Sequence, residues 1–296
     1  MKKLAKAVVV LLFLAGALGL AGGLPEGVHP VVETLAAFRH YALAALLMAV
    51  LGFVLWRQKL LAVLAFGLLA YGGYTIRHQL TAPAPLEEGI SLLQSNLRYD
   101  NDARLLLDYA KATAPDVITL QEVTTTSIPQ LAQMRRDYPY QIICRFVYAR
   151  SVAILSKHRF AGPPGQGCDE GTGMVSARIE LPHGDVSVVS LHLHWPWPYH
   201  QAAHLENMLP KLQELERPVV VAGDFNMVPW AAPVSAVGAA TGTRVVGGLR
   251  FTKALFGGLV QLPIDQVLAP VGWQASAQTG PKLGSDHNSV LLRFSR

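Results

Sequence analysis

The sequence has little cysteine and no cysteine pattern that would bind a structural metal. Cys144 and Cys168 are its only cysteines, and no Cys/His cluster has the spacing of a structural zinc site. A chain of 296 residues buries a core that folds without cross-links, so the sequence excludes a small disulfide- or metal-stapled scaffold. The two cysteines can pair in an oxidising compartment or remain as buried thiols, and the sequence leaves both alternatives open.

Charged residues are also scarce. They make up 15% of the chain, whereas 51% of the residues are hydrophobic, a balance that predicts a membrane-embedded part. The first 81 residues carry seven of the 25 lysines and arginines but only two of the 20 acidic residues. Residues 82–296 carry 18 of each sign, so the net charge of +5 does not indicate a basic nucleic-acid-binding surface.

Three apolar runs without charged residues occupy the N-terminal part, at 7–24, 41–56 and 60–76. The second run is short for a membrane-spanning helix, which needs about 20 residues, unless its flanking basic side chains extend to the interfaces. We therefore predict a membrane anchor at 1–80 with about three transmembrane helices. A proline-containing linker at 81–87 and a catalytic domain at 88–296 follow.

The placement of basic residues predicts the orientation of the anchor. If all three runs span the membrane, the segment before the first run and the turn between the second and third runs lie on the same side of it. These two segments hold Lys2, Lys3, Lys6, Arg57 and Lys59. Only Arg39 and Arg77 lie on the other side, so the first side is predicted to be cytoplasmic and the catalytic domain periplasmic or extracellular. Cleavage of a signal peptide near Ala21-Gly22-Gly23 is an alternative that leaves the domain outside.

Beyond the linker, runs typical of β-strands outnumber helical ones. Helices are predicted at 102–113 and 202–215, and strands at 90–96, 117–122, 141–145, 152–156, 174–180, 186–192, 219–222, 264–268 and 290–294. Many strands with few helices, without repeats or low-complexity tracts, favour an α+β class and a two-sheet sandwich flanked by helices.

Polar and acidic side chains lie at the ends of apolar strand patterns at several places. These residues are Asn96, Glu122, His192, His194, Asp224, Asn226, Asp265, Asp286 and His287. Buried carboxylates are costly unless they are paired or bind a cation, and carboxylate and amide oxygens suit Mg²⁺ or Mn²⁺ better than Zn²⁺. Taken singly each residue has an ordinary alternative: Asn96 could cap a turn, Glu122 could be a surface residue, Asp224 with Asn226 could form an Asx turn, and His192 could be a packed histidine.

The order of these segments resembles the endonuclease/exonuclease/phosphatase (DNase I-like) superfamily, as a membrane-anchored bacterial member. The resemblance covers about residues 88–296 and is carried by the following motifs: the strand ending at Asn96, Asp116-Val-Ile-Thr-Leu-Gln-Glu122, Val-Ala-Ile-Leu-Ser-Lys at 152–157, Leu191-His192-Leu193, Gly223-Asp224-Phe225-Asn226, Ile264-Asp265 and Ser285-Asp286-His287. It implies a four-layer α/β/β/α sandwich.

The resemblance also implies roles, residue by residue. Glu122 is expected as the main metal carboxylate, with Asn96 beside it and Asp286 as a second acid on the metal side. Asp224 would position or deprotonate water, and Asn226 would steady the pentavalent phosphorus. Asp265 would orient His287, and His192 would contact the phosphate or protonate the leaving oxygen. Gln266 departs from the aromatic residue or histidine that many relatives have there, which leaves substrate contacts at that position open.

An aromatic segment directly follows the His192 strand. Trp195, Trp197 and Tyr199, with His194 and His200, are candidates for stacking on substrate or for contact with a membrane interface. The alternative is that the rings pack the loop against the helix at 202–215.

Together the residues predict an Mg²⁺- or Mn²⁺-dependent phosphodiesterase or phosphatase on the outer face of the cytoplasmic membrane. Its partners would be the lipid bilayer and a phosphoester substrate such as an envelope lipid. A DNA or RNA nuclease of the same fold is the alternative, although the neutral catalytic domain does not favour nucleic acid. A binding module without catalysis would lack a metal- or water-binding residue, and none is missing. The sequence does not distinguish substrates, one metal from two, or the oligomeric state.

Overall fold

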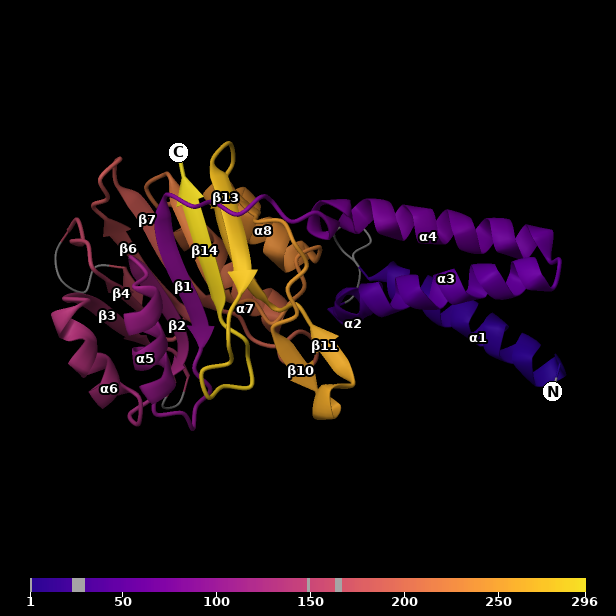
Figure 1. The fold of residues 1–296 in the computed structure, drawn as a ribbon, viewed down its shortest axis with the longest axis horizontal. Coiled ribbons are helices and arrows are strands. Elements are labelled where there is room, and N and C mark those ends of the chain that lie inside the picture. Colours follow the sequence, from indigo (N-terminus) through magenta and orange to yellow (C-terminus); the bar gives the residue numbers. More distant parts are fainter. Residues whose placement is uncertain (1, 23–29, 148–149, 163–166) are drawn as a thin grey trace.

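A group of long N-terminal helices projects from a β-sandwich in the computed structural model (Figure 1). The structure describes residues 2–22, 30–147, 150–162 and 167–296. The sandwich consists of two six-stranded sheets, and a separate two-stranded hairpin lies beside it.

The first sheet has the strand order β13-β14-β1-β2-β4-β3. Its strands are β1 (Ile90–Asn96), β2 (Val117–Val123), β3 (Tyr140–Arg145), β4 (Ser151–Ser156), β13 (Gln274–Thr279) and β14 (Val290–Ser295). The second sheet has the order β5-β6-β7-β8-β12-β9. Its strands are β5 (Cys168–Asp169), β6 (Met174–Ile179), β7 (Val186–His192), β8 (Val219–Asp224), β9 (Thr243–Val245) and β12 (Asp265–Pro270).

Helices cover the outer face of each sheet. Helices α5 (Arg104–Thr113) and α6 (Ile128–Gln133), followed by the 3₁₀ turn η2 (Met134–Arg136), pack on the first sheet. Helices α7 (Gln201–Gln213) and α8 (Ala232–Thr241) pack on the second. A separate apolar core fills the space between the sheets, which explains why every residue of β1 after Ile90 is buried. The predicted α+β class and four-layer α/β/β/α sandwich are confirmed.

Each sheet contains one parallel pair of strands joined by a helix. In the first sheet β1 and β2 run parallel through α5, and in the second β7 and β8 run parallel through α7. Strand pairing places Asn96 opposite Gln121 and His192 opposite Asp224. The carboxyl ends of these strands thus carry four of the predicted polar positions, since Glu122 follows Gln121 directly.

The N-terminal helices are α1 (Lys2–Ala21), α2 (Pro30–Leu35), the 3₁₀ turn η1 (Ala36–Phe38), α3 (Arg39–Leu55) and α4 (Lys59–Leu80). Three helical segments, Lys2–Ala21, Pro30–Leu55 and Lys59–Leu80, are long and apolar enough to cross a membrane. The second run was short in the sequence, but its helical segment begins at Pro30 and has 26 residues. Residues 23 and 24 of the first predicted run lie outside the described residues, as does Gly23 of the alternative cleavage site.

Small residues let α1 and α3 approach each other closely. A Cβ atom on Gly16 would lie 2.6 Å from a side-chain carbon of Leu46, and one on Gly52 would lie 2.6 Å from Val9. Close packing through glycine is a common way for helices to associate in a membrane, where burial of apolar surface supplies little drive.

Several helices and strands of the structure were not predicted from the sequence. They are α6, α8, β5, β9, β13 and the hairpin of β10 (Lys253–Leu255) and β11 (Val260–Leu262), whose strands are joined by the 3₁₀ turn η3 (Phe256–Gly258). Cys144 on β3 and Cys168 on β5 form a disulfide. This bond joins an edge strand of the first sheet to an edge strand of the second.

Candidate active site

The predicted polar residues gather at one edge of the sandwich, where strands of both sheets end. Asn96 and His192 are the last residues of β1 and β7, and Asp224 is the last residue of β8. Asp265 begins β12 and pairs directly with Asp224 across the antiparallel strands. His287 enters from the loop before β14, so both sheets contribute to a single cluster.

Asp224 lies at the centre of this cluster. Its Oδ2 accepts a hydrogen bond from Asn96 Nδ2 at 2.9 Å, and its Oδ1 accepts one from the main-chain N–H of Asn226 at 2.8 Å. Oδ2 also lies 3.7 Å from His192 Nε2 and 3.8 Å from His287 Nε2. Burial raises the pKa of Asp224 to about 6, an effect that the charge of Asp265 increases and the charge of His287 opposes.

Gly223 allows Asp224 to reach this position. A Cβ atom at Gly223 would lie 1.9 Å from the main-chain oxygen of Leu191 on the neighbouring strand β7. Any other residue would push β8 away from β7, and with it the carboxylate from His192. The glycine in the Gly-Asp motif is therefore required by close strand packing.

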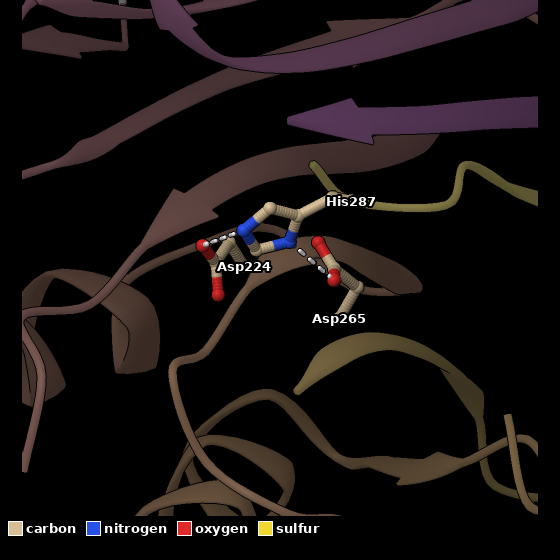
Figure 2. Close-up of side chains that lie close together, drawn as sticks. All are labelled: Asp224, Asp265 and His287. Carbon is tan, nitrogen blue, oxygen red and sulfur yellow. Dashed lines mark hydrogen bonds and ion pairs between the residues drawn. The ribbon is translucent and has the colours of Figure 1, made fainter. Parts of the chain in front are cut away.

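His287 and Asp265 form a buried dyad (Figure 2). His287 Nδ1 lies 2.8 Å from Asp265 Oδ2, and Gln94 Nε2 donates to the other carboxylate oxygen at 2.9 Å. Burial alone would lower the pKa of His287, but the charges of Asp265 and Asp224 outweigh it and raise the pKa to about 9. His287 is therefore a cation at neutral pH, and its Nε2 faces Asp224.

His192 has the opposite protonation preference. Its side chain is buried beside the edge of the Phe146 ring, with the ring centroids 5.5 Å apart. Burial lowers the pKa of His192 to about 4, although the charge of Glu122 acts in the other direction. Its Nδ1 is buried without a partner among the described residues. The site thus holds one neutral and one protonated imidazole.

Asn226 follows Asp224 in a left-handed backbone conformation, with φ of +48°. Its Nδ2 donates to the main-chain oxygen of Leu193 at 2.8 Å. Its Oδ1 is buried and finds no partner within the described residues. The atom that Asn226 leaves unpaired is therefore an acceptor, suited to a water molecule or a cation. The bond from Asn226 N to Asp224 also makes the predicted Asx turn, so that alternative and a functional role are both compatible with the geometry.

Glu122 and Asp286 lie at the solvent side of the cluster, and each faces a cation. Glu122 has φ of +54°, its Oε2 accepts the N–H of Tyr99 at 3.1 Å, and its Oε1 lies 3.7 Å from Arg150 Nη1. Asp286 forms an ion pair with Lys253, and its Oδ1 lies 3.9 Å from His287 Nε2. Burial tends to raise the pKa of Asp286, but Lys253 and His287 lower it overall.

The donor set fits a hard divalent cation. Asp224, Asp265 and His287 offer ligand atoms within 4.8 Å of one another, but Asp265 and His287 already bind each other through atoms that face inward. Glu122 has a strained backbone conformation, and its carboxylate lies at the solvent side of the cluster. This position is more suitable for binding a cation than that of the Asp265–His287 pair. With the unpaired Oδ1 of Asn226, the oxygen-rich set matches Mg²⁺ or Mn²⁺.

Two of the groups at the site are cations that sequence reasoning missed. Arg150 lies on the β3–β4 connection and Lys253 on β10, and each is brought to a carboxylate by tertiary structure alone. Gln94 was visible as a polar residue within an apolar strand, because its neighbours Leu92 and Leu93 are core residues. Thr252 also belongs to the site, since its Oγ1 accepts the N–H of Asp265 at 3.1 Å.

The Gln266 side chain points away from the site. It is buried on the opposite side of β12 from Asp265, because successive residues of a strand point to opposite faces. Its Nε2 donates to the main-chain oxygens of Met227 and Pro263 at 3.0 and 2.6 Å. Gln266 therefore supports the backbone beside the site.

The aromatic segment after β7 does not pack inward as a unit. Trp195, Trp197 and Tyr199 are 36%, 51% and 63% exposed. His194 instead packs beside the ring of His204, with centroids 4.3 Å apart, and His204 Nδ1 accepts the His194 N–H. The three large rings are thus exposed in the segment that follows the strand carrying His192. Among the described residues, the rings that His194 contacts are those of His204 and Phe146.

Comparison with known proteins identifies the family and the fold. A model of the endonuclease/exonuclease/phosphatase family matches residues 91–287, more than half of the chain. No curated protein matches. Among solved structures, D. rerio TDP2 in complex with a single-strand DNA product is similar, with 18% identity, a TM-score of 0.54, and coverage of 71% of this chain and 100% of that one.

Two further solved structures share the fold. The 3′ phosphatase NExo from Neisseria, bound to a product DNA hairpin, has 16% identity and a TM-score of 0.53 over 70% of this chain and 100% of that one. The beta toxin from Staphylococcus aureus, with bound magnesium ions, has 14% identity and a TM-score of 0.53 over 70% of this chain and 99% of that one.

Proposed function

The chain belongs to the endonuclease/exonuclease/phosphatase family, and from this we propose that it is a divalent-metal-dependent phosphoester hydrolase. The observation that carries the proposal is the environment of Asp224. Its carboxylate is held by Asn96 and by the Asn226 backbone, and it faces one neutral and one cationic imidazole. A fixed base beside a fixed cation is what attack of water on a phosphoester needs.

In the proposed reaction Asp224 orients the attacking water and accepts its proton. A carboxylate whose pKa is about 6 is a stronger base than an ordinary aspartate and is still mostly ionised at neutral pH. The protonated His287, fixed by Asp265, supplies positive charge next to the phosphate oxygens, which carry the negative charge in the transition state. His192 is neutral and buried at the same edge, so its Nε2 can donate a hydrogen bond to a phosphate or leaving-group oxygen.

Glu122, Asn96 and Asp286 are the residues that we assign to binding Mg²⁺ or Mn²⁺. When bound, the ion would neutralise negative charge on the phosphate oxygens. Asn226 supports this region through its unpaired Oδ1, which can accept from a water molecule or face the cation. Glu122 lies beside Arg150 and Asp286 pairs with Lys253, so each carboxylate already has a basic partner before a cation binds.

We further propose that the enzyme is a multi-pass protein of the cytoplasmic membrane that acts outside the cytoplasm on a lipid or lipid-linked phosphoester. The three long apolar helices and the excess of lysine and arginine on one side support the location. The Cys144–Cys168 disulfide also favours an oxidising compartment. The exposed rings of Trp195, Trp197 and Tyr199 would contact substrate or lipid.

Hydrolysis of DNA or RNA is the second candidate. Two similar solved structures contain product DNA, and exposed aromatic rings can stack on bases as well as on lipid. The equal numbers of acidic and basic residues beyond the anchor favour it less, because a nuclease must neutralise many phosphates.

A substrate screen tests both proposals. The full chain in detergent would be assayed with Mg²⁺, Mn²⁺ or a chelator against phospholipids, inositol phosphates, nucleotides, and single- and double-stranded DNA. Asp224→Asn is the control, since it keeps the shape of the side chain but removes the base. Metal-dependent turnover that this variant loses supports the hydrolase, and the preferred substrate decides between the candidates. The absence of turnover on every phosphoester would overturn the proposal.

A further inference from the structure

The outer ends of the N-terminal helices are packed into the catalytic part of the chain. Ala36, Ala37 and Ile76 belong to the same apolar core as the residues between the second sheet and α8. Trp230 Nε1 donates to the main-chain oxygen of Ala36 at 2.8 Å, and Glu33 Oε1 accepts the N–H of Ala232 at 3.0 Å. The anchor therefore holds the loop that runs from Asn226 to α8.

A second contact joins the anchor to the β10–β11 hairpin, which lies beside α2 and the start of α3 (Figure 1). Tyr41 Oη accepts the main-chain N–H of Gln261 at 2.6 Å. His40 Nε2 lies 3.0 Å from the main-chain oxygen of the same residue. Both main-chain polar groups of one β11 residue are thus bound by neighbouring side chains of the anchor.

The hairpin leads directly from this contact to the catalytic cluster. Gln261 pairs with Ala254 on β10, next to Lys253, which forms the ion pair with Asp286. Lys253 also forms a β-bridge with His287. The preceding residue, Thr252, binds the main-chain N–H groups of Asp265 and Asn288 through its side-chain and main-chain oxygens.

The hairpin has little other support at its far end. Phe256 and Leu259, in the connection between β10 and β11, are 78% and 83% exposed. A two-stranded hairpin is marginally stable by itself, so its position depends on the contacts at its base and along β11. The anchor supplies the hydrogen bonds to Gln261 on β11, and Val260 and Leu262 pack against the apolar core that Ala36 and Ala37 share.

We propose that His40 and Tyr41 are positioning residues for catalysis: by fixing β11 they fix Lys253, Asp286 and the His287–Asp265 dyad. The anchor would then be part of the active-site framework and not only a tether. This inference rests on the proposed hydrolase function, and it adds that hydrolysis of a small water-soluble substrate also depends on the anchor. A tether alone would affect only substrates in a membrane.

The test uses the full chain in detergent and bis(4-nitrophenyl) phosphate as a soluble probe. The double variant His40→Ala/Tyr41→Phe removes both bonds to Gln261, and His40→Gln/Tyr41→Phe restores one donor. Tyr74→Phe is the matched control, because Tyr74 is an exposed residue of α4. Loss of the two bonds is expected to lower kcat about tenfold and to raise the half-saturating Mn²⁺ concentration several-fold, with partial rescue by His40→Gln.

Hydrogen exchange gives a readout that does not depend on turnover. The amides of residues 251–262 should exchange faster in the double variant, whereas those of the central strands should not change. The inference would be overturned if kcat, the metal requirement and the exchange rates were all unchanged in the double variant. It would also be overturned if activity were lost and a lowered thermal midpoint showed that the whole protein had unfolded. If the wild-type chain hydrolyses no phosphoester, the hydrolase proposal fails. The hydrogen-exchange rates and the Mn²⁺ affinity of the variants still decide whether the anchor positions the hairpin.

Discussion

Replacing Asp265 with asparagine removes the charge that holds His287 protonated while keeping the size of the side chain. In the wild-type protein His287 Nδ1 lies 2.8 Å from Asp265 Oδ2, and both residues are buried. Without that charge, burial dominates, so the pKa of His287 should fall from about 9 to below its ordinary value of 6.5. The imidazole would then be neutral at pH 7.5, and the cation beside the phosphate would be lost.

The size of the effect follows from the shift. A rise from 6.5 to about 9 corresponds to about 3 kcal/mol of preference for the protonated form in the folded protein. Because the folded pKa is raised, this stabilisation is fully present below pH 6.5 and is lost as the pH rises through about 9. If even half of it acts in the transition state, Asp265→Asn lowers kcat/KM about tenfold to a hundredfold at pH 7.5.

The assay is a double-mutant cycle measured over pH 6 to 10 on a soluble phosphodiester, at about unit steps. Asp265→Asn, His287→Ala and the double variant should lose similar amounts of kcat/KM, because the residues act as a unit. The wild-type rate should fall on the alkaline side near pH 9, and this limb should be absent in Asp265→Asn. Asp108→Asn, on the exposed side of α5, is the matched control. Strictly additive losses, or an unchanged alkaline limb, would refute the dyad.

Three further predictions address the metal, the disulfide and the topology. Glu122→Ala should lose activity mainly through weaker metal binding, so excess Mg²⁺ or Mn²⁺ should restore part of the rate; wild-type activity at limiting metal would contradict the assignment. Protein isolated from its native location should show no free thiol after denaturation and two after reduction; two free thiols before reduction would exclude the disulfide. Cys144→Ser should lower the free energy of unfolding by about 3 kcal/mol, because the bond closes a loop with a sequence separation of 24. A reporter that works only outside the cytoplasm should be active when fused after Arg296, whereas activity of a cytoplasm-only reporter there would reverse the topology.

Strands with strong apolar patterns were predictable almost to the residue. The segments 90–96 and 186–192 coincide with β1 and β7, because both are buried on both faces and bounded by polar residues. Elements with weak patterns were missed. Strand β13 has the sequence Gln-Ala-Ser-Ala-Gln-Thr and lies at the edge of its sheet, so it carries few of the large apolar residues that mark a strand. Helix α8 consists mainly of small apolar residues, and its exposed positions include Ala232 and Ala239, so no polar face marks its solvent side.

The sequence predicted which residues make up the site better than it predicted which side chains pair with one another. It identified Asp224, Asp265 and His287 from their positions at the ends of apolar strands and from the order of their motifs, and the structure brings these three together. It did not identify Lys253 or Arg150, because an isolated basic residue on a loop or short strand has no local pattern that distinguishes it from a solvated one. Pairing of this kind depends on how distant segments are placed in three dimensions.

The mutual position of the two sheets explains why polar residues occur within their central strands. In the proposed site Asn96 from one sheet meets Asp224 from the other, and apolar contacts alone would not fix the register between two packed faces. Gln94 on β1 donates to Asp265 on β12 at 2.9 Å and to Gln121 at 2.8 Å, and Gln121 donates to Ser190 on β7 at 2.9 Å. Each of these directional bonds is lost if the sheets slide by a fraction of a residue, and a buried unpaired amide is costly. The same network that orients Asp265 therefore also holds the sheets in the one register at which the residues of the site meet.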